Sequence, residues 1–326
     1  MNGQVRFDAP GPHARTPDTR CLAAARSLRW ATMPFMPDLM LRAVAPAADL
    51  RIIVVKNDDV VQAIAEAHAC TGAAVVPLGQ VVTGAQLLGT QLKGPGAVSV
   101  RLEGRGALRS IIAEANPFGL VRALVRAPAE ARAAGTADGL LGPGTLSVER
   151  RAAEGAPAYT GVVEVQGGDV GAGFAHYLRQ SEQIDCLLGL ATVRGQGSRV
   201  ASGGFMVQLF PGSDAQALER LRANLARHAS LDALVGACDA AELLGALTEG
   251  LASTVLRTDS PAMYCPCSRE RFLSSVAALP LDDVLELLSG GKDLETRCDF
   301  CLSLYVLGVA ELEAMLRQRS AGGPTN

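Results

Sequence analysis

Short hydrophobic runs of two kinds fill residues 36–211. The run at 50–55 (LRIIVV) is rich in β-branched residues and apolar except at Arg51, which is typical of a strand. Residues 97–103 instead alternate apolar and polar positions, as a half-buried strand does. We expect further strands at 108–115, 119–125, 144–151, 159–165, 184–193 and 202–210, and helices at 60–70, 75–92 and 170–179. The sequence therefore predicts an α+β core domain with a mixed, largely antiparallel sheet.

The pattern changes after this domain, because leucines at helical spacing dominate residues 212–259. One face holds Leu218, Leu221 and Leu225, and a second group follows at 243–251. A segment of this kind has no core of its own and must lay its apolar face on a neighbouring domain. We expect a helical linker here, and the pattern leaves open whether it is permanently packed or can be released.

The two ends of the chain lack such periodicity. Residues 1–35 are rich in Pro and Arg and are expected to be a disordered N-terminal extension. Two other interpretations are an organelle-targeting peptide and a true start at Met33, Met36 or Met40. Residues 321–326 are expected to be a tail.

Composition narrows the class of protein. Hydrophobic residues make up 48% of the 326 positions and aromatic residues only 4%, so the core must consist mainly of Val, Leu and Ala. The net charge of −3 lacks the excess of positive charge that attracts nucleic acid or an anionic membrane surface. We find no uninterrupted apolar run of 18 residues and no signal peptide. We therefore expect a cytoplasmic protein with reduced cysteines and with neither nucleic acid nor membrane as a partner.

Four of the eight cysteines form two closely spaced pairs near the end of the chain. Cys265 and Cys267 make the first knuckle (265–267), and Cys298 and Cys301 make the second knuckle (298–301). Each pair can present two sulfurs to one ion in the tetrahedral geometry of zinc–thiolate sites. The spacing predicts a four-cysteine zinc site, with Zn²⁺ as the cofactor. The alternatives are ordinary buried cysteines or two disulfides of a secreted module.

The residues around the knuckles predict a small zinc-binding domain over 260–320. We expect a helix at 269–279, a second helix ending at 288, short strands at 294–297 and 302–307, and an amphipathic segment at 309–316. Because a domain of this length can bury only a small hydrophobic core, a bound metal would supply much of its folding free energy.

Other candidate motifs are weaker. The glycines at 168, 171 and 173 open a helix after a strand, but their spacing is not that of a nucleotide-binding loop, and a turn is the favoured interpretation. The four histidines stand apart from metal-ligand or nucleophile patterns and are expected to be surface or packing residues. Cys21, Cys70, Cys186 and Cys238 lack a partner at knuckle spacing, and we assign them no redox role.

Two other functions fit a cysteine-rich module. A nucleic-acid-binding zinc module is disfavoured because residues 261–326 hold six Lys and Arg against nine Asp and Glu. A thiol-disulfide oxidoreductase needs an exposed Cys-Xaa-Xaa-Cys at a helix start, whereas the second knuckle leads into an expected strand.

The knuckles, in this order and spacing and followed by Tyr305, closely resemble the carboxy-terminal module of the bacterial redox-regulated chaperones of the heat shock protein 33 family. The similarity covers roughly residues 38 to 317. It includes the stretches at 92–94 (LKG), 102–108 (LEGRGAL), 159–163 (YTGVV) and 177–183 (YLRQSEQ). The chain departs from the family at 122–124, where Arg-Ala-Leu replaces the usual Arg-Gly-aromatic run.

This resemblance implies an ATP-independent holdase chaperone that is not an enzyme and that binds unfolding proteins under oxidative stress. In the reduced state, zinc would hold all four thiolates and the linker would stay docked. Oxidation would form the disulfides Cys265–Cys267 and Cys298–Cys301, release zinc, and unfold the redox-sensitive linker and the zinc domain. Unfolded client proteins are the expected partners, together with a homodimer of the oxidised chain.

Overall fold

The structure, a computed structural model, describes residues 37–136, 139–152, 159–184, 186–195, 199–210 and 215–321. The expected extension over residues 1–35 and all but the first residue of the expected tail lie outside the described residues.

Five strands form sheet A in the order β10-β1-β2-β9-β8, with every neighbouring pair antiparallel. Their bounds are β1 (Leu39–Ala45), β2 (Leu50–Lys56), β8 (Cys186–Arg194), β9 (Val200–Leu209) and β10 (Thr254–Asp259). Strand β2 is central and covered on both faces, which is why its sequence is apolar without alternation. Ile53 and Val55 pack on one side of the sheet, whereas Ile52 and Val54 pack on the other.

Six strands form sheet B in the order β11-β5-β4-β3-β6-β7. Their bounds are β3 (Gly96–Gly104), β4 (Ser110–Ala115), β5 (Leu120–Arg126), β6 (Gly144–Ala152), β7 (Tyr159–Val165) and β11 (Ala262–Met263). All pairs are antiparallel except β11 with β5, which is parallel. The predicted α+β class with largely antiparallel strands is confirmed.

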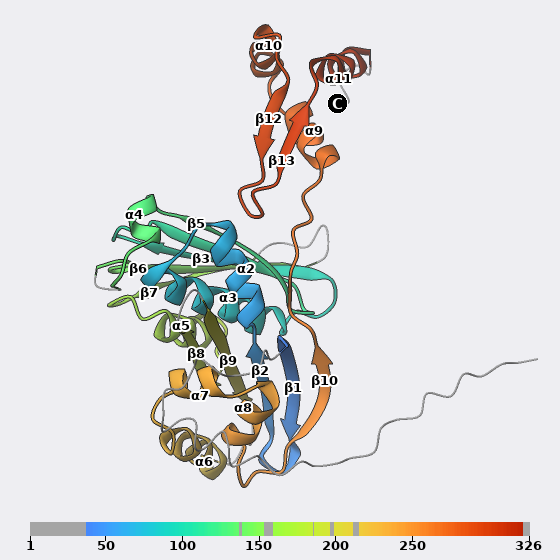
Figure 1. Cartoon of the computed structure of the whole chain (residues 1–326). Coiled ribbons are helices and arrows are strands. Elements are labelled where there is room, and N and C mark those ends of the chain that lie inside the picture. Colours follow the sequence, from blue (N-terminus) through green and yellow to red (C-terminus); the bar gives the residue numbers. More distant parts are fainter. Residues whose placement is uncertain are drawn as a thin grey trace, which may run out of the picture.

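Helices fill the space between the two sheets (Figure 1). The helices of this layer are α2 (Asp58–Ala67), α3 (Val75–Gly89) and α5 (Val170–Ser181), and the 3-10 turn η3 (Gly72–Ala74) leads into α3. The short helix α4 (Ala129–Arg132) follows β5, and the 3-10 turn η2 (Pro46–Ala48) connects β1 to β2, where Ala48 joins the core on the other face of sheet A. Among the described residues, one helical stretch, Gly72–Gly89, is long and apolar enough to cross a membrane by length and composition, but 89% of it is buried inside the fold. It is the central core helix. The glycine-rich turn before α5 places Gly167 and Gly168 at positive φ, and Asp169 then caps the helix.

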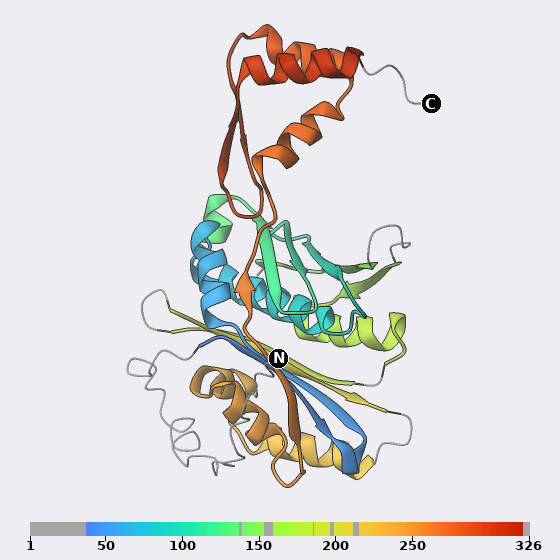
Figure 2. The same ribbon diagram turned by 90° about the vertical axis from the view of Figure 1, so that its right-hand side faces the viewer.

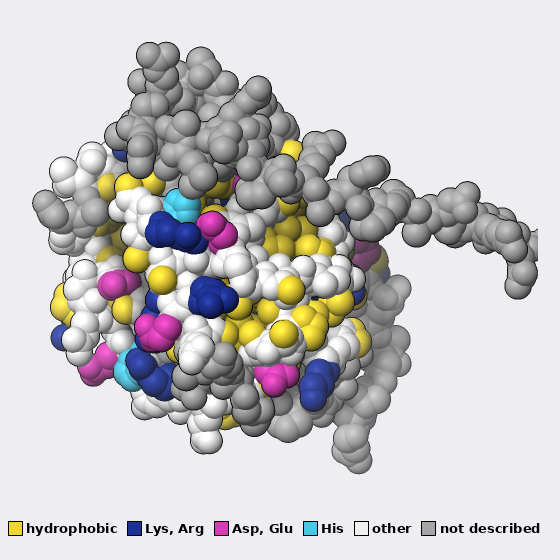
Figure 3. Space-filling model, turned by 90° about the horizontal axis from the view of Figure 1, so that it is seen from below, with side chains coloured by type: hydrophobic (Ala, Val, Ile, Leu, Met, Phe, Trp, Pro, Cys, Tyr) yellow, Lys and Arg dark blue, Asp and Glu magenta, His cyan; other side chains and the backbone are white. Residues whose placement is uncertain are grey.

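Three linker helices cover the other face of sheet A: α6 (Ala215–Ala226), α7 (Leu231–Ala237) and α8 (Ala240–Leu247). Leu221, Leu243 and Leu247 are fully buried in a second core with residues of β1, β2 and β9. Figure 1 places these helices at the lower end of the molecule, and the view from below shows hydrophobic side chains gathered there among scattered charges (Figure 3). The expected docking of the linker's apolar face is therefore present.

The end of the expected helical linker is a strand. Residues 254–259 form β10, which pairs with β1 at the edge of sheet A, with Val44 opposite Thr254 and Met40 opposite Asp259. The prediction of helix was wrong here. The segment contains β-branched Thr254, Val255 and Thr258, but it is an edge strand with five exposed positions, so it lacks the apolar pattern that marks a buried strand.

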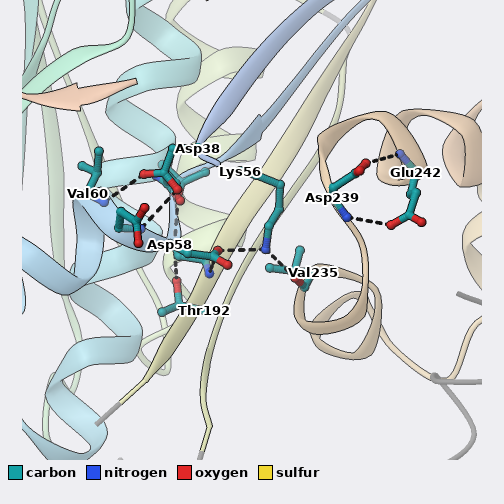
Figure 4. A network of polar contacts seen from close by, with 12 residues as sticks. Asp38, Lys56, Asp58, Val60, Thr192, Val235, Asp239 and Glu242 are labelled. Atoms are coloured by element: carbon teal, nitrogen blue, oxygen red, sulfur yellow. Dashed lines mark hydrogen bonds and ion pairs between the residues drawn. The ribbon is translucent and has the colours of Figure 1, made fainter. Parts of the chain in front are cut away.

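A buried lysine joins the linker to the core domain (Figure 4). Lys56, at the end of β2, is 2% exposed. Its ammonium group donates to the backbone oxygen of Val235 in α7 and lies 2.8 Å from a carboxylate oxygen of Asp58. In the next helix, Asp239 and Glu242 form a capping box that fixes the start of α8.

The C-terminal module follows β11 and stands at one end of the molecule (Figure 2). It contains α9 (Arg269–Ala277), α10 (Leu281–Ser289), β12 (Leu294–Arg297), β13 (Leu304–Leu307) and α11 (Val309–Ala321). Among the described residues after 264, the buried hydrophobic positions are Val284, Cys298, Leu307 and Leu312. A core of this size is too small to secure the module by itself.

Candidate metal centre

The first knuckle begins where the chain leaves sheet B. The backbone N–H of Tyr264 donates to the oxygen of Val121 in β5 at 2.9 Å, which fixes the chain one residue before Cys265. Pro266 lies between the two cysteines, and Ser268 then caps α9 by accepting from the backbone of Arg271. The knuckle is thus held between a strand and a capped helix.

The second knuckle is the turn of the β12–β13 hairpin. Arg297 and Leu304 are the last paired residues, and the N–H of Leu302 donates to the oxygen of Cys298 at 2.8 Å. Leu302 has φ +58°, a left-handed conformation that bends the chain back into β13. The Cys-Xaa-Xaa-Cys pair therefore lies in a hairpin turn and not at the start of a helix.

The two knuckles bring all four predicted sulfurs together. The Sγ atoms of Cys265, Cys267, Cys298 and Cys301 all lie within 4.8 Å of one another. The shortest pairs join the knuckles, with Cys265 to Cys298 at 3.6 Å and Cys267 to Cys301 at 3.3 Å. A tetrahedral ion with metal–sulfur bonds of about 2.3 Å separates its sulfurs by about 3.8 Å. The cluster has the size and the donor set of a single four-sulfur metal site.

Neighbouring hydroxyl groups contact the sulfurs. The Tyr305 hydroxyl lies 3.1 Å from Cys267 Sγ, and the Tyr305 ring packs at 4.9 Å from the ring of Phe272 in α9. Ser303 lies 3.3 Å from Cys301 Sγ. These contacts orient the ligands from the hairpin and from the helix that follows the first knuckle.

The thiols of the cluster differ in acidity. Burial raises the pKa of Cys267 to about 12, and burial also raises the pKa of Cys298. At Cys301 burial acts in the same direction, but hydrogen bonds with Ser303, Cys267 and Cys298 together outweigh it and lower the pKa to about 6. Four negative thiolates in this space need a cation to balance them, so metal binding has to displace protons from the more weakly acidic thiols.

Arg122 of β5 connects the core domain to the metal centre. The Arg122 guanidinium lies 3.7 Å from Cys265 Sγ, ion-pairs with Glu114 of β4 at 2.6 Å, and stacks 4.0 Å from the ring of Phe300. Burial lowers the pKa of Arg122, but hydrogen bonds to Glu114 and Cys265 outweigh it and raise that pKa. Sequence reasoning did not predict the contact of Arg122 with the centre, because Arg122 is distant from both knuckles along the chain.

Two of the remaining cysteines occupy different buried positions. Cys70 is 4% exposed, and burial raises the pKa of its thiol to about 11, so it is a poor nucleophile. Cys238 is 2% exposed at the end of α7 and is bonded in a disulfide, so it is not a free thiol, contrary to the expectation from its spacing. Cys186 is half-buried in β8, and Cys21 lies outside the described residues. None of the three that the structure describes belongs to the metal centre.

Comparison with known proteins identifies the family. The family model described as Hsp33 protein matches residues 38–308, which is most of the chain. The chain belongs to the Hsp33 family. Hsp33 is a chaperone family, so the predictions of family and of chaperone class are confirmed.

The chain aligns with similar proteins over nearly their full length. The 33 kDa chaperonin of Desulforamulus reducens is 31% identical over 291 residues, covering 87% of this chain and 98% of the relative. That of Geobacter sulfurreducens is 32% identical over 291 residues, covering 87% and 96%. The crystal structure of the Hsp33 homologue from Thermotoga maritima superposes with a TM-score of 0.76 at 22% identity, covering 88% of this chain and all of that one. This structural similarity shows that the two chains share a fold.

Proposed function

We propose that this chain is an ATP-independent holdase chaperone that is switched on by oxidation of a zinc–thiolate centre. The observation that supports this most strongly is the convergence of four sulfurs within 4.8 Å in a module that has few buried side chains. A set of four thiolates without carboxylate or imidazole ligands favours zinc over magnesium or calcium.

The reduced chain would use all four cysteines, Cys265, Cys267, Cys298 and Cys301, as thiolate ligands. Bound zinc would supply the folding free energy that the small core of the module lacks. The folded module holds the chain after β11 in place, and β10 and β11 lie directly before the first knuckle. The metal centre is thereby connected to the segment that also carries the linker helices.

Oxidation by a peroxide would remove the ligands. One thiolate of a pair attacks the peroxide and becomes a sulfenic acid with release of hydroxide. The second thiolate then displaces hydroxide from that sulfur and closes the disulfide. Formation of each disulfide therefore transfers two electrons from the two sulfurs to one peroxide. Family resemblance supports the pairs Cys265–Cys267 and Cys298–Cys301. Sulfurs in disulfides no longer hold zinc, and the module loses its main source of stability.

The released elements would then bind clients. The buried leucines of α6, α7 and α8 and the face of sheet A beneath them form one apolar core, and undocking would expose both sides of it. Unfolding proteins present complementary apolar surface, so binding needs no nucleotide. We place this activity in the cytoplasm, with a homodimer of the oxidised chain as a further species.

One experiment tests the switch directly. Zinc release, followed with a chromogenic chelator, is measured in the same sample as the suppression of aggregation of a denatured client, before and after peroxide. We expect about one zinc per chain to leave as holding activity appears, and reductant with zinc to reverse both. Peptide mapping under non-reducing conditions identifies the disulfide pairs, and sedimentation measures the dimer.

The control variant is Cys70→Ala, which removes a buried thiol outside the centre and should keep the full response. Cys298→Ser should hold zinc poorly and should already suppress aggregation when reduced. Zinc loss without a gain in holding, or equal holding before and after oxidation, would show that the centre only stabilises the fold.

A further inference from the structure

The second knuckle rests on the core domain through Phe300. Its backbone oxygen lies 2.9 Å from His68 Nε2, and because a carbonyl only accepts, that nitrogen carries the proton. His68 is 4% exposed at the end of α2. An outer ion pair, Arg126 with Asp299 at 3.7 Å, is exposed on both sides and contributes little. The less exposed part of this contact, which we name the seat, consists of buried His68 and half-buried Phe300 and Arg122.

Arg122 joins the seat to the first knuckle. Its Nη1 atom lies 3.7 Å from Cys265 Sγ, while its Nε and Nη2 atoms lie 2.8 and 2.6 Å from one oxygen of Glu114. The other oxygen of Glu114 accepts from Arg151 at 2.8 Å, which fixes the carboxylate in turn. The same guanidinium stacks on the Phe300 ring at 4.0 Å. One side chain on a rigid strand therefore contacts a metal ligand in one knuckle and the ring of the other knuckle.

The strength of this contact depends on the state of the sulfur. Four thiolates around a divalent cation leave two net negative charges on the centre. An N–H donor that carries a positive charge binds a charged sulfur more strongly than a neutral one. A sulfur in a disulfide is neutral, so the attraction between Arg122 and Cys265 would be lost in the oxidised chain.

We propose that Arg122 is a positioning residue through which the core domain holds the C-terminal module only while Cys265 is a metal-bound thiolate. This rests on the proposed zinc–thiolate centre and adds a second connection from the centre to the core besides the chain between β10 and the first knuckle. Loss of the thiolate charge would loosen the seat in the same step that removes a ligand.

The test compares Arg122→Gln with Arg101→Gln in the full-length chain. Arg101 lies on β3 of the same sheet and forms an exposed ion pair with Glu103 at 3.5 Å, so it is a matched control. Hydrogen exchange is measured in peptides covering β5 and residues 298–303, and zinc loss to a chelator is followed without oxidant. We expect Arg122→Gln to bind one zinc as the parent does, but to exchange and to lose zinc roughly tenfold faster. Arg122→Lys, which restores the charge, should recover part of the difference.

Two comparisons separate positioning from a general structural role. After oxidation and zinc removal, Arg122→Gln and the parent chain should exchange at equal rates in residues 298–303, because the module is released in both. An arginine that acts only through packing would leave Arg122→Lys exchanging as fast as Arg122→Gln in the reduced, zinc-bound chain, because the charge would not matter. Should Arg122→Gln fail to fold, Glu114→Gln frees the guanidinium from its carboxylate and should shift the same rates in the same direction by a smaller factor.

The outcomes are distinct. Equal exchange and equal zinc loss in Arg122→Gln and Arg101→Gln would overturn the role of Arg122 and leave the zinc switch intact. A parent chain that binds no zinc would overturn the proposed function, and the role of Arg122 with it.

Discussion

At the scale of single residues, Asp38 shows how burial changes a carboxylate at the start of a helix. Its two oxygens accept from the backbone N–H groups of Asp59 and Val60 at 3.1 and 2.9 Å (Figure 4). Burial nevertheless raises its pKa from 3.8 to about 6, because desolvation outweighs these hydrogen bonds. The ionised form is thus less favourable in the folded chain than in the unfolded one.

This pKa shift predicts a pH dependence of stability. Because the folded pKa is raised, the folded chain binds more protons than the unfolded chain between about pH 4 and pH 6, and the contribution of Asp38 to stability is lost as pH rises through this window. Asp38→Asn should flatten the dependence by on the order of 1 to 3 kcal/mol. Denaturant unfolding at pH 4.5 and pH 7 measures it. Glu66→Gln, an exposed change at the other end of α2, should keep the parent slope.

At the scale of elements, the linker is held by a buried polar contact and by apolar packing. The polar contact is the hydrogen bond from Lys56 to the Val235 backbone oxygen. Lys56→Met retains most of the volume of the side chain but leaves that oxygen without its donor, at a cost of about 1–3 kcal/mol. We expect faster hydrogen exchange in α7 and α8 and some holding activity in the reduced chain. Lys93→Met, at an exposed position, should change neither, and protection equal to the parent's in Lys56→Met would show that packing alone holds the linker.

The apolar part of the same docking can be tested at Leu243, which is fully buried in α8. Leu243→Ala should cost about 2–5 kcal/mol, concentrated in the linker. The reduced variant is expected to suppress client aggregation while sheet B stays protected from exchange. Leu88→Ala, an equally buried truncation between the sheets, should instead lower the melting temperature of the whole fold. Similar exchange profiles for the two variants would contradict a separately releasable linker.

At the scale of the whole molecule, the small number of buried side chains in the C-terminal module makes its folding dependent on metal. Removing zinc with a strong chelator under reducing conditions should unfold residues 265–307 and release the linker helices, while the core between the two sheets remains folded. Circular dichroism and hydrogen exchange measure this. Because protons compete for the thiolates, less chelator should be needed at pH 6 than at pH 8. A module that stays protected without metal would contradict this dependence.

The sequence predicts some levels of this architecture well and others poorly. Residues 294–297 were expected to be a strand and are β12, and the knuckle spacing predicted four sulfurs that do converge. These features depend on local pattern. Strand β10 was missed because an exposed edge strand has no periodic apolar face, and its partner β1 lies near the other end of the chain. The contact of Arg122 with Cys265 was missed for the same reason, since it depends on how two distant segments meet in space.

The pairing of β1 with β10 also determines when the protein can finish folding on the ribosome. Sheet A needs β9, which ends at Leu209, and β10, which ends at Asp259, before the β1–β2 hairpin is flanked on both sides. At translation speeds of roughly 5–20 residues per second, the finished hairpin waits on the order of ten seconds for β9 to emerge. During that time Ile52 and Val54 pair with β1, but they lack both β9 at the other edge and the linker helices that later cover them. The nascent chain is therefore prone to aggregate while it is being made. A chain that ends before residue 200 lacks β9 and β10, so both edges of its β1–β2 hairpin stay exposed.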